Sequence, residues 1–160
     1  MRKTNKIEAV FWSIALPGFG QILNGQLIKG MLFIFLEFLI NVMSSFNKAI
    51  MLSFLGQISE AVKIIDYQWL MFYPCVYMFA MYDAYKHAGD NNGPFSFLPF
   101  AFGAYFVTVG LMYSTKLTIF SVFFGPIFLP MLFLIPGLLV GFLIRYILKM
   151  TKIKDDDSSA

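Results

Sequence analysis

Charged side chains are scarce in this sequence of 160 residues. Asp, Glu, Lys and Arg make up 13% of the chain, whereas hydrophobic residues make up 59% and aromatic residues 19%. An ordinary soluble domain has about 25% charged residues. A soluble domain of this length has too much surface to hide so many apolar side chains. The composition therefore excludes a soluble globular domain, a disordered chain and a nucleic-acid-binding protein, and it favours an integral membrane protein.

Reactive and metal-binding side chains are few as well. The chain has one cysteine, Cys75, and one histidine, His87, so the sequence offers no internal disulfide and no Cys or His metal cluster. It contains neither a phosphate-binding loop nor a His-Glu-x-x-His motif. Its serines in apolar stretches lack an obvious base. We therefore expect no enzyme activity, no catalytic residue, no metal site and no cofactor.

Charges interrupt the hydrophobic sequence at intervals that suit membrane-spanning helices, each of which needs about 20 mostly apolar residues. We expect an all-α, polytopic helical membrane protein with a single membrane domain over residues 1–150. The polar segment 151–160 is expected to be a disordered tail. The apolar segments are expected at residues 9–24, 30–46, 67–83, 95–113 and 127–148.

Two connecting segments have patterns of their own. Apolar residues recur at helical spacing over about residues 49–65, which predicts an amphipathic helix in the membrane interface or, alternatively, a helix packed over the bundle. Residues 115–124 are expected to form a short interfacial or re-entrant piece before the break at Gly125-Pro126. Pro130 and Pro136 should kink the last crossing helix.

The distribution of Lys and Arg separates the topologies, because cytoplasmic loops carry an excess of basic residues. If segment 9–24 dips into the membrane and returns, four full crossings place nine basic residues on the side of the N-terminus and three opposite. Five crossings give six on each side, and six crossings give ten against two. We prefer four crossings, with six as the alternative. Both place the two termini in the cytoplasm.

The most distinctive motif runs from Leu16 to Gly25, followed by Lys-Gly at the start of an apolar helix. Its glycines allow tight turns and close backbone approach, and its amides should face protein or the interface. A second motif, Tyr-Asp-Ala-Tyr over residues 82–85, ends segment 67–83. The turn and packing residues are Pro17, Gly18, Gly20, Gly25, Lys29 and Gly30, and the amides are Gln21 and Asn24.

Because of these two motifs, residues 10–88 resemble small bacterial multi-pass membrane proteins related to the two-transmembrane-helix domain family. The resemblance implies a multi-pass membrane protein, usually without an assigned activity. It also implies that segment 9–24 is half of a helical hairpin, which favours the alternative with six crossings.

Glu37 is the one acidic residue well inside an apolar segment. A carboxylate there is costly unless it is paired, protonated or facing a polar cavity, and Asn41 lies one turn further on the same helix face. We expect Glu37, Asn41, Gln21 and Asn24 to form a polar intramembrane site. Glu37 would contact an ion, a proton or a substrate, or it would be a structural partner for Lys29 or the two amides.

Small residues four apart allow helices to approach closely. Gly137 and Gly141 have this spacing, as do Ala80 and Ala84, and either pair would serve packing within the chain or homodimerisation. Asp83 is expected to form an interfacial ion pair with Lys86 or a helix-end contact. Tyr67 and Trp69 are expected at the membrane interface.

These features favour a non-enzymatic multi-pass protein of the bacterial plasma membrane. It would be an accessory, assembly or regulatory subunit that acts through helix–helix contacts. Its partners would be the lipid bilayer and a second membrane protein or further copies of itself, and not nucleic acid. The alternatives are a small oligomeric transporter or ion pathway that uses Glu37 and, less favoured, an immunity protein against a membrane-active peptide.

Overall fold

The structure, a computed structural model, describes residues 4–89 and 92–158 and is mostly helical. The helices are α1 (Lys6–Ala15), α2 (Phe19–Leu23), α3 (Leu27–Ser44), α4 (Phe46–Phe54), α5 (Ile58–Ile64), α6 (Tyr67–Leu70), α7 (Tyr73–His87), α8 (Leu98–Tyr113) and α9 (Gly125–Ser158). Two short strands, β1 (Thr118–Ile119) and β2 (Val122–Phe123), pair in an antiparallel hairpin.

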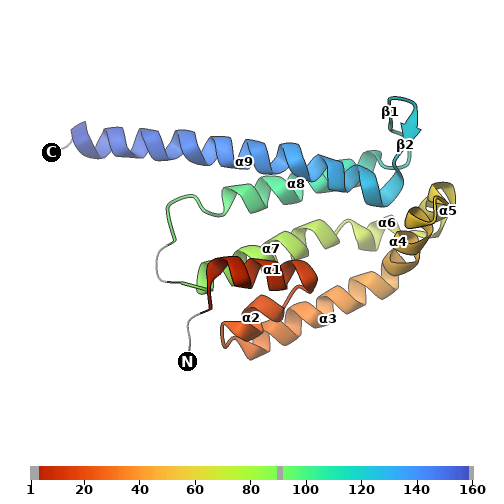
Figure 1. Cartoon of the computed structure of the whole chain (residues 1–160), viewed down its shortest axis with the longest axis horizontal. Coiled ribbons are helices and arrows are strands. Elements are labelled where there is room, and N and C mark those ends of the chain that lie inside the picture. The colour runs from red at the N-terminus through yellow and green to blue at the C-terminus, as the bar shows by residue number, and fades with distance from the viewer. Residues whose placement is uncertain (1–3, 90–91, 159–160) are drawn as a thin grey trace.

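Four helices run along the length of the molecule. In Figure 1, α3, α7, α8 and α9 lie side by side with alternating directions, and the N- and C-terminal ends lie at the same end of the molecule. We call this the terminal end. The opposite end carries α4, α5 and the β-hairpin (Figure 1). Alanines of α4 and α5 pack there with Leu70, Leu111 and Ile127 in one buried cluster.

The close packing of α8 against α9 depends on glycine. A Cβ atom at Gly141 would lie 2.5 Å from Pro99 Cα, and one at Gly137 would lie 2.8 Å from the Phe102 carbonyl oxygen. A Cβ atom at Gly110, from the other helix, would lie 2.9 Å from Pro130 Cα. Real Cβ atoms do not approach their neighbours so closely. The pair Gly137 and Gly141 is therefore used inside the chain.

The N-terminal segment forms a helical hairpin shorter than the long helices. The α1 helix ends at Ala15, the chain turns at Gly18 with a positive φ of 110°, and α2 follows. In Figure 1 the hairpin lies beside the terminal half of α7 and α3. With ten residues, α1 is about 15 Å long, half the thickness of a bilayer's hydrocarbon core.

Three connecting or terminal segments differ in shape from what the sequence predicted. Residues 49–65 form two helices, α4 and α5, because Gly56 has a φ of +78° and ends the first one nearby. Within residues 115–124, where we expected a short interfacial or re-entrant piece, residues 118–123 form the β-hairpin. The α9 helix continues through residues 151–158, where we expected a disordered tail, because neither glycine nor proline follows Gly141 to end it.

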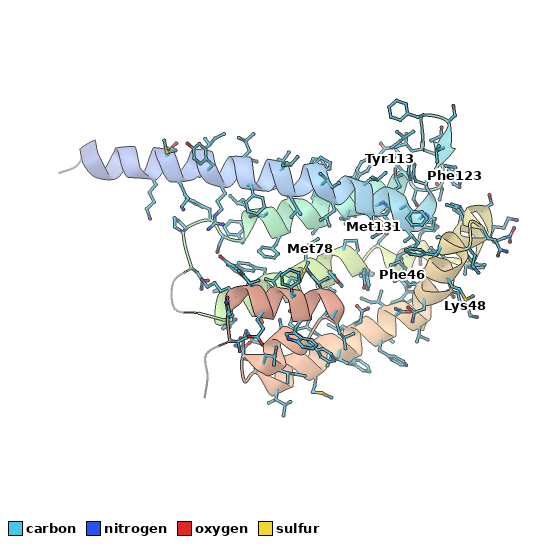
Figure 2. All side chains as sticks on the ribbon, viewed as in Figure 1. Phe46, Lys48, Met78, Tyr113, Phe123 and Met131 are labelled. Atoms are coloured by element: carbon cyan, nitrogen blue, oxygen red, sulfur yellow. The ribbon has the colours of Figure 1, made fainter. Side chains whose placement is uncertain are left out.

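Apolar side chains cover the outer faces of the long helices. Figure 2 shows side chains projecting outward all along α3 and α9. Two described helical segments are long and apolar enough to cross a bilayer, Leu27–Ser44 and Gly125–Lys152, and α8 is apolar but shorter. Exposed hydrophobic residues of these two segments recur at helical spacing: Met31, Phe35, Phe38 and Val42 in α3, and Met131, Ile135, Leu139, Phe142 and Tyr146 in α9.

Candidate functional site

A polar cluster centred on a buried carboxylate joins the N-terminal hairpin to the end of α7. Gln21 of α2 donates through Nε2 to the Ala80 carbonyl at 2.7 Å and to Asp83 Oδ2 at 3.2 Å. Asn24 donates to the Ala84 carbonyl at 2.8 Å. The structure thus brings the two sequence motifs into contact across about 60 residues of chain. We call Gln21, Asn24, Lys29, Asp83 and His87 the Asp83 cluster.

The Asp83 carboxylate is the centre of this cluster. Its side chain is 11% exposed, and Lys29 Nζ lies 3.1 Å from Asp83 Oδ1 in an ion pair. His87 Nδ1 lies 2.7 Å from the Asp83 carbonyl oxygen and 3.4 Å from Oδ1. The expected partner Lys86 is exposed instead, and the observed partner comes from the first turn of α3. This corrects the pairing expected from proximity in sequence.

Glycines allow the backbones of the cluster to approach. A Cβ atom at Gly20 would lie 2.7 Å from Ala84 Cβ and 2.6 Å from the Ala9 carbonyl oxygen. A Cβ atom at Gly30 would lie 2.8 Å from the Gly18 carbonyl oxygen. Gly25 adopts a φ of +78° just after α2. The motif therefore folds the hairpin tightly enough for its amides to reach α7.

Three buried amide oxygens of the motif have no hydrogen-bond donor among the described residues: Gln21 Oε1, Asn24 Oδ1 and Gln26 Oε1. Buried carbonyl acceptors normally have a donor, a water molecule included. Pro17 of the same motif is also fully buried. In chemical terms the cluster offers a paired carboxylate and neutral acceptors. The described residues include no group of three side chains that could hold a metal ion.

Glu37 lies apart from this cluster. Its Oε1 accepts a hydrogen bond from the Tyr73 hydroxyl at 3.0 Å. The Tyr73 ring packs on Phe46, with centroids 4.8 Å apart, and on Tyr77, at 5.3 Å. The Tyr77 hydroxyl donates to the Ile14 carbonyl oxygen at 2.5 Å. Glu37 is therefore half-buried between α3 and the first turns of α7, with a tyrosine as its partner.

Asn41 belongs to neither group. Its side chain exchanges two hydrogen bonds with Asn47, from Nδ2 to Asn47 Oδ1 at 3.1 Å and from the Asn47 N–H to Oδ1 at 3.2 Å. These bonds hold the turn from α3 into α4, where Ser45 has a φ of +58°. The single polar site expected from Glu37, Asn41, Gln21 and Asn24 is thus divided among three places in the structure.

Tyr67 and Trp69 lie in α6, which precedes α7 at the end opposite the termini. Asp66 begins this helix by accepting hydrogen bonds from the Gln68 and Trp69 N–H groups at 2.9 and 3.3 Å. The Tyr67 hydroxyl accepts a hydrogen bond from Ser114 Oγ at 3.4 Å. Both aromatic residues are half-buried. The Tyr67 contact ties α6 to Ser114, which follows the end of α8.

Sequence reasoning did not identify Tyr73 and Tyr77 as partners of polar groups in α3 and α1. Their spacing of four residues places both rings on one face of α7. That spacing was the available signal, although it does not reveal which helix the rings face.

Comparison with protein-family models found no match, and comparisons with curated proteins and with solved structures found none either. Membership of the two-transmembrane-helix domain family therefore stays a prediction that rests on the two motifs alone.

Proposed function

We propose that this chain is a non-enzymatic multi-pass protein of the bacterial plasma membrane. It acts as an accessory, assembly or regulatory subunit through helix–helix contacts. The observation that carries this proposal is the division of polar and apolar groups. Gln21 and Lys29 both bind the buried Asp83 carboxylate, whereas apolar side chains cover the outer faces of α3 and α9. Such an outer surface suits lipid and other helices.

In the proposed topology, α3, α7, α8 and α9 cross the bilayer and the α1–α2 hairpin enters it and returns. The α7 and α8 helices have 15 and 16 residues, so they are about 22–24 Å long, slightly shorter than the hydrocarbon core. Flanking residues and local thinning of the bilayer accommodate such a mismatch. In Figure 1, α6 also extends the line of α7.

The distribution of basic residues indicates which end of the molecule faces the cytoplasm. The terminal end carries Lys29 in the first turn of α3, Lys86 in the last turn of α7 and Arg145 in the terminal half of α9. The opposite end has Lys48, which Figure 2 shows on α4, together with Lys63 and Lys116. Because basic residues favour the cytoplasmic side, we place the terminal end in the cytoplasm.

The test is gentle detergent extraction of the tagged chain from its native membrane, followed by mass spectrometry of co-purifying proteins. We expect a second membrane protein in stoichiometric amount. The matched variants are Phe38→Ala and Leu139→Ala, which shorten exposed side chains on the outer faces of α3 and α9. One of them should lose the partner while the other keeps it. Recovery of the chain alone from every mild detergent would refute the accessory role.

The position of Glu37 favours a second function, the conduction of ions or protons. The carboxylate lies in the middle of a candidate membrane span, and the hydroxyls of Tyr73 and Tyr77 lie on the same face of α7 nearby. Such a row of polar groups inside a membrane is typical of ion and proton paths. Wild-type protein in vesicles should then conduct ions or protons, and Glu37→Gln should abolish the flux while keeping the Tyr73 hydrogen bond. Vesicles without wild-type flux would exclude this function.

A further inference from the structure

An apolar groove runs between α7 and α8. Its volume is about 390 Å³. Several lining residues, among them Cys75, Phe79 and Phe97, are exposed, so the groove is open along the outer face of the two helices. Met78 closes its inner side, and its Cε would lie 3.4 Å from a Cβ atom at Gly103 (Figure 2 labels Met78 between the two helices).

The position of the groove along the helices indicates what it can hold. Tyr82 and Phe97 lie at the terminal end of α7 and α8, whereas Cys75 and Ala104 lie seven residues further into the molecule. Seven residues of helix correspond to about 10 Å. The groove therefore starts at the proposed cytoplasmic interface and extends along much of one leaflet's hydrocarbon. This is the shape and polarity of a site for part of an acyl chain.

Two cations converge at the segment that leads into α8, close in sequence to the groove residue Phe97. A Cβ atom at Gly93 would lie 3.2 Å from a terminal nitrogen of Arg145 and 3.9 Å from Lys149 Nζ. Arg145 Nε also donates to the Pro94 carbonyl oxygen at 3.3 Å. Pro94 precedes Phe97, a lining residue of the groove, by one turn of chain. The cation pair and the mouth of the groove thus share the segment that leads into α8.

No acidic side chain among the described residues forms an ion pair with Arg145 or Lys149. The two residues lie four apart on α9, where like charges repel each other. An anion held between them would remove this repulsion. A phosphate group suits the pair, because guanidinium and ammonium groups both donate charge-assisted hydrogen bonds to phosphate oxygens.

We propose that the groove between α7 and α8 and the pair Arg145–Lys149 bind one anionic phospholipid of the cytoplasmic leaflet. An acyl chain occupies the groove, and the phosphate lies at the two cations near Gly93. Basic pockets between membrane helices on the cytoplasmic side are known to select anionic headgroups. This site depends on the membrane placement proposed above, but it needs no partner protein.

The test uses the full chain purified in dodecyl maltoside, with native mass spectrometry and thermal unfolding as readouts. The probes are dioleoyl phosphatidylglycerol, dioleoyl phosphatidylcholine and inorganic phosphate. We expect phosphatidylglycerol to bind more tightly than phosphatidylcholine and to raise the unfolding temperature, while inorganic phosphate does neither. Arg145→Gln with Lys149→Gln should reduce the preference for phosphatidylglycerol by roughly thirtyfold.

Matched variants keep the result interpretable. Lys48→Gln with Lys116→Gln removes the same charge at the opposite end and should keep the preference. Ala101→Phe fills the groove and should weaken retention of both lipids, whereas Ala15→Phe adds the same ring at another exposed alanine and should not. Size-exclusion profiles identify any variant that fails to fold, and Lys149→Gln alone then replaces the double variant, with about a fivefold loss expected.

Equal binding of the two lipids by the wild type would overturn the proposal, and so would protection by inorganic phosphate alone. An unchanged preference in the Arg145 and Lys149 variants would also overturn it. Because these measurements are made on the isolated chain, their failure leaves the accessory role standing. Conversely, a missing partner protein leaves the lipid result standing.

Discussion

Asp83 shows how one carboxylate organises the terminal end. It accepts from Lys29 and Gln21, which belong to the elements on either side of the turn at Gly25. Lys29 is about half exposed whereas Asp83 is buried, so the acid has the larger desolvation cost and the greater need for partners. The ion pair therefore holds α3 on α7, and the Gln21 hydrogen bond holds the α1–α2 hairpin on the same carboxylate.

Replacing Asp83 by Ala should destabilise the protein, because Gln21 and Lys29 each lose an acceptor in a mostly buried site. We expect a loss of about 1–3 kcal/mol in the free energy of unfolding, measured by thermal or denaturant unfolding in detergent. Glu60→Ala is the matched control, because Glu60 and Lys63 form an ion pair in which both side chains are mostly exposed. Its cost should stay below about 1 kcal/mol. Equal costs for the two variants would contradict a structural role for Asp83.

At the scale of elements, the packing of α8 on α9 shows how the small residues Gly137 and Gly141 are used. They could serve packing within the chain or an interface between two copies. The backbones approach through Gly137 and Gly141 of α9. Small residues that serve packing within the chain are covered by other parts of the chain. Gly137 and Gly141 are both buried, as this use requires. The same spacing on an exposed face would instead have favoured a homodimer.

Gly141→Leu should therefore separate α8 from α9 and reduce stability by about 1–3 kcal/mol through overpacking. Leu139→Phe, on the exposed face of the same helix, enlarges a side chain without meeting a neighbour and should have little effect on unfolding. Both variants are measured by thermal unfolding together with molecular mass in detergent. A change in oligomeric mass without loss of stability in Gly141→Leu would show that this glycine serves an interface between copies.

For the whole molecule, the proposed topology makes labelling predictions. In a Cys75→Ala background, Lys48→Cys and Lys116→Cys should react with a membrane-impermeant thiol reagent added to intact spheroplasts. Asn5→Cys and Thr151→Cys should react only after permeabilisation. These four positions lie in described segments at the two ends of the molecule.

Lys86→Cys separates four crossings from six. It lies at the terminal end of α7, so four crossings place it in the cytoplasm, whereas six crossings place it outside. We expect labelling only after permeabilisation. Labelling of Lys86→Cys in intact spheroplasts would reject the topology with four crossings, and labelling of Asn5→Cys there would reject a cytoplasmic N-terminus.

Local sequence signals predicted the elements better than their contacts. The helical content and the break at Pro17-Gly18 followed from hydropathy and turn chemistry, and Gly18 does adopt a positive φ. The turn of the β-hairpin was not foreseeable, because Phe120 and Ser121 adopt positive φ without the Asn, Asp or Gly that usually marks such turns. The hairpin at residues 118–123 therefore carried no sequence signal.

The sequence also did not predict which residues far apart in the chain would be in contact. Asp83 and Lys29 are 54 residues apart, so periodicity within either helix could not connect them, and the nearer Lys86 was the natural expectation. The contact between Glu37 and Tyr73 was missed for the same reason, since the 36 positions that separate them include the helices α4, α5 and α6. Hydrophobic patterns give the facing surface of a helix but not the identity of its neighbour.

The distance in sequence between Gln21 and Asp83 also affects the order in which parts of the protein can fold. The two groups are 62 positions apart along the chain, and at typical rates of translation that stretch takes roughly 3–12 s to synthesise. During that interval the amides of the N-terminal hairpin have left the ribosome before their α7 partners exist. The hairpin must therefore wait in contact with water, the lipid headgroups or the insertion machinery. It can settle against α3 and α7 only after α7 has been made, so the first segment synthesised is not the first to reach its final place.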